Sequence, residues 1–447
     1  IMNQNILVIG QGGREHAIAW KISKSPNVSK VYVCPGNGGT ELDSSLLNVN
    51  LNINDHDSLV NFAKQNNITM TIVGPENPLA AGIVNSFLNA GLKIFGPKKQ
   101  YALLESSKVF SKEFMKNFNI PTSEYQMFSS NQEAKDFCST KKHPIVIKAD
   151  GLAAGKGVVV SASIDESYEA IDSLLKSEHS DYIVVEEFLN GQELSAIYIV
   201  NYQGISYEIG LPWTKDYKSR DEYNSGPNTG GMGAVSHPLS FENKNSLFKL
   251  HLDIEKILIK TLTSINNYNK DDGVGYLGFL YMGLMINNKD EINVLEYNCR
   301  LGDPETQNIM LTLHNKDVDL LDLILGRKNN KKDFNLDRID NEDNGYCCTL
   351  VLAAKGYPES YKKGFYLDLS SIKETDQLVI FHSGTDIENG KIVSKGGRIL
   401  SVNVYANDRQ KAIDMAYEKI KEIKVFEDKD FKHQNQDLVF FREDIGN

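Results

Sequence analysis

The stretch Lys148-Ala-Asp-Gly-Leu-Ala-Ala-Gly-Lys-Gly-Val158 is the part of the sequence that decides the fold. Residues 144–148 before it and 158–161 after it are rich in β-branched side chains, which predicts two strands joined by a glycine-rich hairpin. No helical pattern follows the glycines, so this is not the strand-loop-helix phosphate loop whose lysine precedes Ser or Thr. Backbone amides in such a hairpin can approach phosphates closely, and Lys148 and Lys156 add positive charge. The hairpin therefore predicts an ATP site.

Lys148 has a second property that points to an anion. Alternation along the first predicted strand places Val146 and Lys148 on one face. A partly buried ammonium group needs an anion to offset its desolvation. We interpret that anion as a phosphate.

The composition is that of an ordinary globular protein. The chain has 447 residues, of which 41% are hydrophobic and 24% charged, and this length predicts several domains. A net charge of -11 argues against a nucleic-acid partner, because phosphate backbones select basic surfaces. The five cysteines show no CxxC spacing, so we expect reduced thiols in a cytoplasmic protein and no zinc site. No apolar run approaches the ~20 residues of a membrane helix, so we expect no membrane partner.

Residues 1–102 alternate strand and helix patterns, which predicts a doubly wound parallel sheet. Three loops follow the carboxyl ends of its strands, where such sheets bind ligands, and they should line one crevice. The loops are residues 10–14, 35–40 and 74–79. The first lacks the full G-x-G-x-x-G spacing of a dinucleotide site, so a phosphate at the start of the following helix is favoured over NAD.

The rest of the chain predicts two further domains. A helix over residues 101–118 leads into a small α+β unit at about 120–192, which carries the hairpin. Longer strands follow, over residues 193–200, 205–211, 278–286 and 291–298, and with a long helix over 242–267 they predict a second, larger sheet. We expect residues 327–333, which are charged and poor in apolar side chains, to link this sheet to a C-terminal α+β domain. The predicted domains are residues 1–102, 103–328 and 329–447.

The polar loop from Trp213 to Gly233 lies between strands of the larger sheet. It carries Asp216, Lys218 and several glycines with a proline. This composition suggests a mobile loop that shapes itself around a ligand. A plain linker is the alternative.

The strand over residues 291–298 carries the expected metal ligands. Alternation places Val294, Glu296 and Asn298 on one face, and two oxygen ligands one pleat apart suit Mg²⁺ held between protein and phosphates. The preceding strand offers no carboxylate, so nucleotide oxygens and waters must complete the coordination. Arg300 follows, where it can neutralise a developing anion. An edge strand that ends in a solvated turn would explain the same residues without a site.

Glu186-Glu-Phe-Leu189 lies between the small unit and the larger sheet. Its backbone groups could meet an adenine, and Glu193 could accept hydrogen bonds from ribose hydroxyls. For these residues alone, a solvated acidic strand end is the better explanation. No Ser-His-Asp or Cys-His arrangement emerges, and His16 is more typical of a hydrogen-bonded helix residue than of a catalytic base.

Several long motifs carry more information together than any one glycine pattern does. They are Gly10-Gln-Gly-Gly-Arg-Glu-His-Ala17, Pro35-Gly-Asn-Gly-Gly-Thr40, Gly74-Pro-Glu-Asn-Pro-Leu79, Ile147-Lys-Ala-Asp-Gly-Leu-Ala-Ala-Gly-Lys-Gly157, Gly226-Pro-Asn-Thr-Gly-Gly-Met-Gly-Ala234 and Glu296-Tyr-Asn-Cys-Arg-Leu-Gly-Asp-Pro-Glu-Thr-Gln307. In this order, over nearly the whole chain, they closely resemble the phosphoribosylamine-glycine ligases, also called glycinamide ribonucleotide synthetases, of the ATP-grasp superfamily.

The resemblance implies a fold and a reaction. The central domain would be an ATP-grasp domain whose small unit is a lid, between the N-terminal parallel sheet and the C-terminal α+β domain. The reaction would be a step of de novo purine synthesis in which glycine, activated as glycyl phosphate, is attacked by the amine of 5-phosphoribosylamine. ATP and Mg²⁺ or Mn²⁺ would be required. The chain would act as a monomer on these small molecules.

The resemblance also implies roles for individual residues. The ATP-binding positions would be Lys108, Lys148, Gly155, Lys156, Gly157, Glu186, Glu187, Leu189 and Glu193, and the metal ligands Glu296 and Asn298. The substrate-binding positions would be Gly12, Gly13, Arg14, Asn37, Gly38, Thr40, Glu76, Asp216, Lys218, Asn228, Thr229, Gly230 and Gly302. The catalytic residues would be Lys148, Arg300 and Asp303, and either Asp303 or Glu305 could deprotonate the amine.

One departure from the family pattern is visible in the polar loop. The family usually has Asp-His-Lys-Arg where this chain has Asp216-Tyr-Lys-Ser219. Arg220, one place on, is a candidate substitute for the missing arginine. Two other functions remain open at this stage: a different ATP-grasp ligase, such as a carboxylase acting on another purine precursor, and a sensor that binds ATP without turnover. Retention of the metal ligands and Arg300 argues against the sensor.

Overall fold

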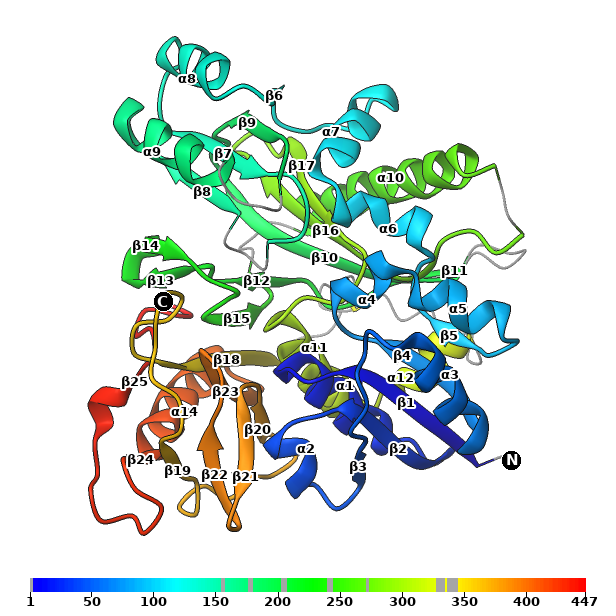
Figure 1. Cartoon of the computed structure of the whole chain (residues 1–447), viewed down its shortest axis with the longest axis vertical. Coiled ribbons are helices and arrows are strands. Elements are labelled where there is room, and N and C mark those ends of the chain that lie inside the picture. Colours follow the sequence, from blue (N-terminus) through cyan, green and yellow to red (C-terminus); the bar gives the residue numbers. More distant parts are fainter. Residues whose placement is uncertain are drawn as a thin grey trace.

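The N-terminal part of the chain is a parallel sheet covered by helices. The computed structural model describes residues 3–153, 157–175, 180–201, 207–238, 244–270, 273–326, 334–335 and 345–447 (Figure 1). The sheet has five strands in the order β3-β2-β1-β4-β5, which confirms the predicted doubly wound topology. The strands are β1 (Gln4–Gly10), β2 (Val28–Pro35), β3 (Leu46–Asn48), β4 (Ile68–Val73) and β5 (Ile94–Phe95), and the helices are α1 (Gly13–Ser23), α2 (Gly38–Leu42), α3 (His56–Gln65), α4 (Glu76–Ala81) and α5 (Ile83–Asn89).

The segment between this sheet and the small unit forms two helices rather than the single helix predicted over residues 101–118. They are α6 (Lys99–Ser106) and α7 (Lys108–Asn117). Ser107 separates them in an extended conformation, and its hydroxyl accepts a hydrogen bond from the Phe110 amide at 3.1 Å. Serine favours this capping geometry over a helix interior, because its side chain satisfies an amide that the first turn leaves free.

The small unit is a four-stranded antiparallel sheet with two helices, and it lies at the top of Figure 1. Its strands are β6 (Tyr125–Phe128), β7 (Ile145–Ala149), β8 (Val158–Ser161) and β9 (Ile183–Glu187), and its helices are α8 (Asn131–Ser139) and α9 (Ile164–Leu175). The pairing of β7 with β8 confirms the hairpin's two strands. Ile145, Ile147 and Ala149 enter the core of the unit, so Lys148 lies on the opposite face, as alternation predicts.

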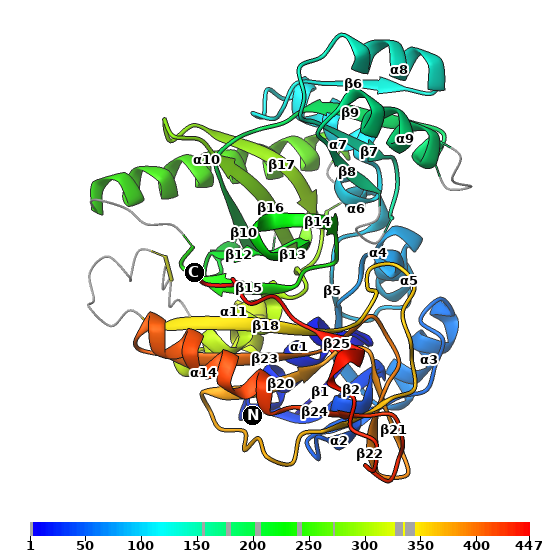
Figure 2. The ribbon, with the colours of Figure 1, turned by 90° about the vertical axis from the view of Figure 1, so that its left-hand side faces the viewer.

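The largest sheet runs from the centre of the molecule into its C-terminal part (Figure 2). Its order is β17-β16-β10-β12-β15-β18-β23-β20, and β11 and β25 pair with β10 and β18. The strands are β10 (Gln192–Asn201), β11 (Tyr207–Gly210), β12 (Thr214–Asp216), β15 (Gly233–Ser236), β16 (Leu277–Ile286), β17 (Ile292–Asn298), β18 (Tyr346–Ala354), β20 (Leu378–His382), β23 (Arg398–Ala406) and β25 (Val439–Phe440). The predicted larger sheet is thus present, and β15 joins it to the C-terminal strands through β18.

Helices and short strands complete the structure. The helices are α10 (Lys244–Tyr268), α11 (Glu305–Asn315), α12 (Leu320–Leu325) and α14 (Arg409–Glu422), and the remaining strands are β13 (Ser219–Asp221), β14 (Ser225–Asn228), β19 (Tyr366–Asp368), β21 (Thr385–Glu388), β22 (Lys391–Ser394) and β24 (Lys424–Phe426). The polar loop therefore contains β12, β13 and β14, where only irregular structure was predicted. The predicted linker at 327–333 lies outside the described residues.

The strand β17 departs from simple alternation. Its register against β16 shifts between Val294 and Glu296, because Leu284 pairs with Val294 and Gly283 with Glu296. Val294 consequently packs in the same core as Tyr297, and the prediction that it shares a face with Glu296 is wrong. Among the described residues, no helix is both long and apolar enough to span a bilayer.

Candidate active site

Two lysines and a glutamate connect the small unit to the central domain. The Glu186 carboxylate on β9 lies 2.9 Å from Lys148 Nζ and 3.0 Å from Lys112 Nζ. Burial would raise the pKa of Glu186, but the two ammonium groups outweigh it and hold that pKa below its usual value. The partner of Lys148 in this structure is therefore a carboxylate, which corrects the interpretation that phosphate alone would balance it. A bridged lysine remains available to a second anion because an ammonium group has three donors.

Lys108 and Asp150 fix the entrance of the hairpin. The Asp150 carboxylate accepts hydrogen bonds from the amides of Lys108 and Val109 at 2.7 and 3.2 Å, at the start of α7. Negative charge at a helix start is favoured by the free amides and the helix dipole. The Lys108 ammonium group donates to the Gly151 carbonyl at 2.7 Å. Lys108 is thus held beside the residues that lead into the glycine-rich stretch.

Glu296 is subject to the positive charge of several lysine and arginine side chains. Burial alone would raise its pKa, but Lys218, Lys148, Lys108 and Arg300 together lower it to about 2. The nearest ammonium group is that of Lys218, whose Nζ lies 3.6 Å from Glu296 Oε1. Glu296 is therefore ionised near neutral pH.

Asn298 lies beside Glu296, as the sequence predicts. Its side-chain nitrogen is 3.5 Å from Glu296 Oε1, and its Oδ1 accepts from Arg300 Nη2 at 3.4 Å. An ionised carboxylate and an adjacent amide oxygen are hard donors of the kind Mg²⁺ prefers. The two residues fit a magnesium ion that takes its remaining ligands from phosphates and water. No cluster of three or more His, Cys, Asp or Glu side chains suited to a metal occurs in the described part of the chain.

Arg300 is clamped between two carboxylates. Its Nη2 lies 2.8 Å from Glu105 Oε2, and its Nε lies 3.3 Å from Glu76 Oε2. Glu105 also accepts a hydrogen bond from the Cys299 amide at 2.9 Å. These contacts come from α6 and α4, so the N-terminal half of the chain aims the guanidinium group. A charge held in a fixed direction stabilises a developing anion without reorganising.

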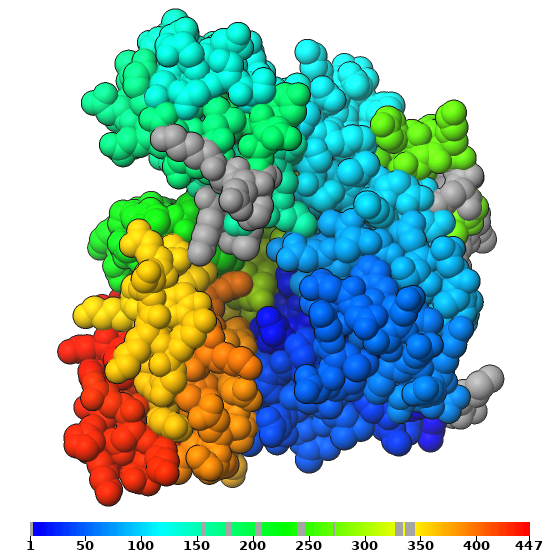
Figure 3. All heavy atoms as spheres, viewed as in Figure 1, coloured from blue at the N-terminus to red at the C-terminus, as the bar shows by residue number. Residues whose placement is uncertain are grey.

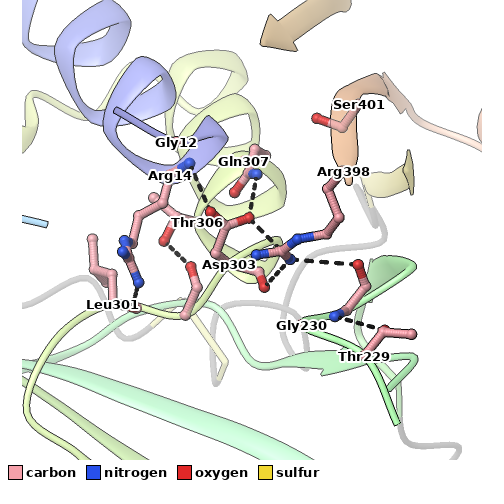
Figure 4. Close-up of polar contacts among 12 residues, drawn as sticks. Gly12, Arg14, Thr229, Gly230, Leu301, Asp303, Thr306, Gln307, Arg398 and Ser401 are labelled. Carbon is pink, nitrogen blue, oxygen red and sulfur yellow. Dashed lines mark hydrogen bonds and ion pairs between the residues drawn. The ribbon is translucent and has the colours of Figure 1, made fainter. Parts of the chain in front are cut away.

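Asp303 forms a junction between the three parts of the chain (Figure 4). It accepts hydrogen bonds from the Arg14 amide at 3.3 Å and from Gln307 Nε2 at 2.8 Å. Arg398, from β23, lies 3.4 Å from the Asp303 carboxylate and donates to its carbonyl at 2.8 Å. Burial would raise the pKa of Asp303, but Arg398 and Arg14 hold it below its usual value. A Cβ on Gly230 would lie 2.8 Å from Arg398 Cζ, so only glycine lets the arginine reach this position.

A cleft of about 710 Å³ opens next to this junction. Figure 3 shows the hollow between the blue N-terminal atoms and the orange C-terminal atoms. Its lining combines the predicted glycine loops with C-terminal residues that were not predicted. The lining is Gln11, Gly12, Pro35, Gly36, Asn37, Glu41, Asn48, Asn50, Asp303, Ser383, Gly384, Thr385, Asp386, Lys395, Gly396 and Arg398.

Comparison with family models covers most of the chain. Residues 4–105 match the phosphoribosylglycinamide synthetase N domain, residues 106–306 its ATP-grasp (A) domain, and residues 347–447 its C domain. A phosphoribosylamine–glycine ligase of Vibrio parahaemolyticus is 40% identical over 448 residues, covering 99% of this chain and 97% of the relative. One of Clostridium acetobutylicum is 40% identical over 446 residues, covering 99% of each.

The chain belongs to the phosphoribosylglycinamide synthetase family.

Solved structures agree with this assignment. The phosphoribosylamine–glycine ligase of Thermotoga maritima superposes with a TM-score of 0.75 at 30% identity, covering 98% of this chain and 99% of that one. A biotin carboxylase domain from Hydrogenobacter thermophilus, in complex with MgADP, superposes with a TM-score of 0.68 at 14% identity, covering 95% and 91%. The second likeness supports the ATP-grasp fold. The fold class predicted from the sequence is thus confirmed for all three parts.

The family positions in the N-terminal loops divide into those that face the cleft and those behind it. Gly12 and Asn37 line the cleft, whereas Arg14 and Thr40 are buried. The Asn37 side chain is engaged in structure: its amide donates to the carbonyls of Gln11 and His382, and its oxygen accepts from the Thr40 amide. Asn37 therefore joins the N-terminal loop to the C-terminal domain. Its backbone is engaged as well, because its amide donates to Thr40 Oγ1 at 2.8 Å and its carbonyl accepts from Asn48 Nδ2 at 3.1 Å.

The remaining positions are spread around the site. Glu187 is exposed and accepts from the Glu124 amide at 2.9 Å, so it faces away from Lys148. Gly155 and Lys156 lie outside the described residues. Arg220 pairs with its neighbour Asp221 at 2.9 Å, and its role as a substitute for the family's arginine stays a prediction. The structure also describes Gly13, Gly38, Gly157, Leu189, Glu193, Asp216, Asn228, Thr229 and Gly302, whose roles stay predictions.

Sequence reasoning missed four charged residues of the site. They are Glu105, Lys112, Asp150 and Arg398. Lys112 and Glu105 lie in amphipathic helices, where a charged residue ordinarily faces solvent. Arg398 follows Gly396-Gly397 at the start of a C-terminal strand, and that glycine pair was not singled out in the sequence. Asp150 belongs to the quoted hairpin, but the helix start that it contacts lies 42 residues earlier, so the sequence offered no local signal.

Proposed function

We propose that this chain ligates glycine to 5-phosphoribosylamine in de novo purine synthesis, with ATP converted to ADP and phosphate through a glycyl phosphate intermediate. The observation that carries this proposal is the group of cations that act on Glu296, together with a cleft of about 710 Å³ beside Asp303 and Arg398. Transfer of the γ-phosphoryl group to a carboxylate brings several negative charges together, and such a site must neutralise them. The membership of the chain in the family supports the same reaction.

The nucleotide end of the site would use Lys108 and Lys148. Both ammonium groups are close enough to Glu296 to influence its pKa, so they share one region of positive potential. The segment from Glu186 to Leu189, with Glu193, would hold the adenosine, and Gly155, Lys156 and Gly157 the phosphates. Mg²⁺ or Mn²⁺ on Glu296 and Asn298 would supply charge to the triphosphate.

The acyl phosphate would form beside Arg300. One carboxylate oxygen of glycine attacks the γ-phosphorus, and the bond from that phosphorus to the β-bridging oxygen breaks as ADP leaves. Arg300, aimed by Glu76 and Glu105, would stabilise the anion, and Lys218 would approach from the polar loop with Asp216. Exclusion of water protects the intermediate from hydrolysis.

The second substrate would occupy the cleft. Its amine attacks the glycyl carbonyl carbon, phosphate leaves with the oxygen that glycine contributed, and the amine loses a proton. Lys395 and Arg398 supply positive charge for the 5-phosphate on the C-terminal wall, opposite the Gly12 loop. This placement supports the substrate role of that loop.

Glu305 is the better of the two candidate proton acceptors. Burial raises the pKa of Glu305 above its usual value, whereas Arg398 and Arg14, opposing burial, lower that of Asp303. A carboxylate with a raised pKa is the stronger base near neutral pH. Asp303 would then orient the Arg14 loop and Arg398 rather than exchange protons.

Isotope transfer tests the proposed chemistry directly. Glycine labelled with heavy oxygen in its carboxylate should deliver one labelled oxygen to the inorganic phosphate formed with ADP, measured by mass spectrometry. Unlabelled phosphate would mean that the carboxylate of glycine never reaches the γ-phosphorus. In a parallel reaction with labelled bicarbonate and unlabelled glycine, transfer of heavy oxygen to the phosphate would instead support the carboxylase alternative.

We further propose that the protein is a cytoplasmic monomer. The five cysteines are free and buried, which supports a reducing compartment. Light scattering of the purified chain tests the monomer, because a second copy would double the measured mass. Activity measured in Mg²⁺ and then in Mn²⁺ decides the metal preference.

A further inference from the structure

A buried arginine near the C-terminus has no role in the reaction described above. Arg442 is only 1% exposed, and its guanidinium group makes a bidentate pair with Asp444, at 2.8 Å from Nε to Oδ1 and 2.6 Å from Nη2 to Oδ2. Burying a charge of this kind is unfavourable unless it is fully paired. The remaining N–H donors of Arg442 identify the segment that it holds in place.

Those donors reach into the polar loop. Arg442 Nη1 donates to the Ser219 carbonyl at 3.1 Å, and both terminal nitrogens lie 3.3 Å from Asn224 Oδ1. The guanidinium carbon lies 5.1 Å from the centre of the Tyr217 ring, a cation–π contact. Tyr217 and Ser219 flank Lys218, and they are the two positions at which this chain departs from the family's Asp-His-Lys-Arg pattern.

The rest of the C-terminal segment binds the same loop. Asp444 Oδ2 accepts from the Tyr223 amide at 2.9 Å, and the Gly446 amide donates to the Tyr217 hydroxyl at 3.2 Å. Tyr223 and Asn224 have φ values of 56° and 55°, a left-handed conformation that residues other than glycine rarely adopt. Figure 2 shows the red C-terminal segment ending beside β15. The hydrogen bonds from the C-terminal segment therefore hold this part of the polar loop in its left-handed conformation.

The polar loop that Arg442 contacts carries Lys218, which belongs to the candidate active site. Lys218 Nζ lies 3.6 Å from Glu296, and the Lys218 carbonyl accepts from the amide and hydroxyl of Thr229 at 2.7 and 2.8 Å. Arg442 thus contacts the residues on both sides of Lys218 without touching the cleft. We propose that Arg442, with Asp444, is a positioning residue that holds the Lys218 ammonium group over Glu296 for the ligation step. This inference rests on the proposed function.

Steady-state kinetics and hydrogen exchange test the proposal together. Arg442→Met should lower kcat by about 10- to 100-fold, because a displacement of about 1 Å in a reacting group can reduce the rate about 100-fold. KM for ATP should stay within about threefold, since Lys148 and Glu186 are untouched. Arg442→Lys should restore only part of kcat, because lysine lacks the planar fork that pairs with Asp444. Exchange of the Tyr223 and Thr229 amides should accelerate in both variants.

Arg409→Met is the matched control. Arg409 also lies over a tyrosine, 5.6 Å from the Tyr346 ring, and donates to the Gly446 carbonyl, but within the described part of the chain it makes no direct hydrogen bond to the polar loop. Its variant should keep kcat within about threefold of the parent. Equal losses of kcat in Arg409→Met and Arg442→Met would overturn the proposal, as would unchanged exchange at Tyr223 and Thr229.

A second variant decides the matter if Arg442→Met does not fold. Asp444→Asn keeps the shape of the carboxylate and removes its charge, and it should show the same fall in kcat and the same faster exchange. Loss of the fold in all three variants, or a normal kcat in Asp444→Asn, would leave Arg442 a structural residue only. Hydrogen exchange is measured without turnover, so it tests whether Arg442 holds the polar loop even if the parent enzyme is inactive with glycine. Such inactivity would refute the proposed function only.

Discussion

Two buried histidines join the N-terminal and C-terminal parts of the chain. The His382 amide donates to His16 Nδ1 at 2.9 Å, so the neutral His16 ring carries its proton on Nε2. Burial lowers the pKa of both imidazoles to about 3, and for His382 the neighbouring His16 adds to the effect. A Cβ on Gly39 would lie 2.6 Å from His16 Cε1, so the surroundings leave no room to hydrate a charged ring.

The pKa values predict how stability changes with pH. Both pKa values are lowered on folding, so the folded rings stay neutral while the unfolded rings take up protons below about pH 6.5. Stability is therefore fully present above that pH and is lost as the pH falls. From about pH 7.5 to about pH 5.5 each histidine should remove about 1.4 kcal/mol, and the pair about 2.7 kcal/mol, from the free energy of unfolding.

Urea denaturation of variants isolates this contribution. His16→Asn keeps an acceptor for the His382 amide and cannot titrate. Its loss of unfolding free energy between the two pH values should be about 1.4 kcal/mol smaller than that of the parent. Trp20 packs against Phe381 at 5.4 Å between ring centres, so its fluorescence in a Trp213→Phe background reports on this interface. Carboxylates that titrate between the two pH values change the stability of the parent and of His16→Asn equally. Their contribution therefore cancels when the two losses of unfolding free energy are compared.

Phe381→Leu is the matched control for that experiment. It weakens the same interface, where its ring lies 5.4 Å from His16, but it removes no titrating group. Its stability should be lower at both pH values, with the pH dependence of the parent. The reasoning is refuted if His16→Asn and the parent lose the same stability on acidification, because the ring would then be as easily protonated in the folded state as in the unfolded one.

Three further predictions concern the reaction. Glu296→Ala should largely abolish ligation, because it removes the carboxylate that faces four cations and the expected metal, and activity within a few-fold of the parent at saturating Mg²⁺ would contradict the assignment. Lys148→Ala should raise KM for ATP more than KM for glycine, since the lost charge faces phosphate, and a glycine-selective defect would move Lys148 to the other substrate. Arg398→Met should raise KM for phosphoribosylamine about tenfold or more while leaving KM for ATP unchanged, and isothermal titration with ATP checks the second half independently.

Local patterns in the sequence were sufficient to predict much of the fold. The strands on both sides of the glycine-rich hairpin, and the parallel order of the first domain, follow from β-branched runs and turn residues, which act over a few neighbours. The placement of Asn298 beside Glu296 follows from the same alternation. The register shift in β17 did not follow, because a bulge depends on how β16 pairs with it.

The charge partners could not be predicted for a related reason. Lys148 meets Glu186, and Asp303 meets Arg398, across long separations in the sequence, and only the finished fold brings these groups together. Tyr217 and Ser219 looked like losses from the family pattern. In the structure both residues contact Arg442, which lies more than two hundred residues away in the sequence. The two residues that differ from the family pattern thus share a contact with one distant side chain.

The central claim is that ATP cleavage here depends on glycine and phosphoribosylamine together. A coupled assay of ADP release, run with freshly generated phosphoribosylamine, measures this directly. We expect rapid ADP formation only when glycine and the amine are both present, with glycinamide ribonucleotide formed in equal amount. ADP release that is independent of glycine, or that bicarbonate supports in its place, would contradict the account.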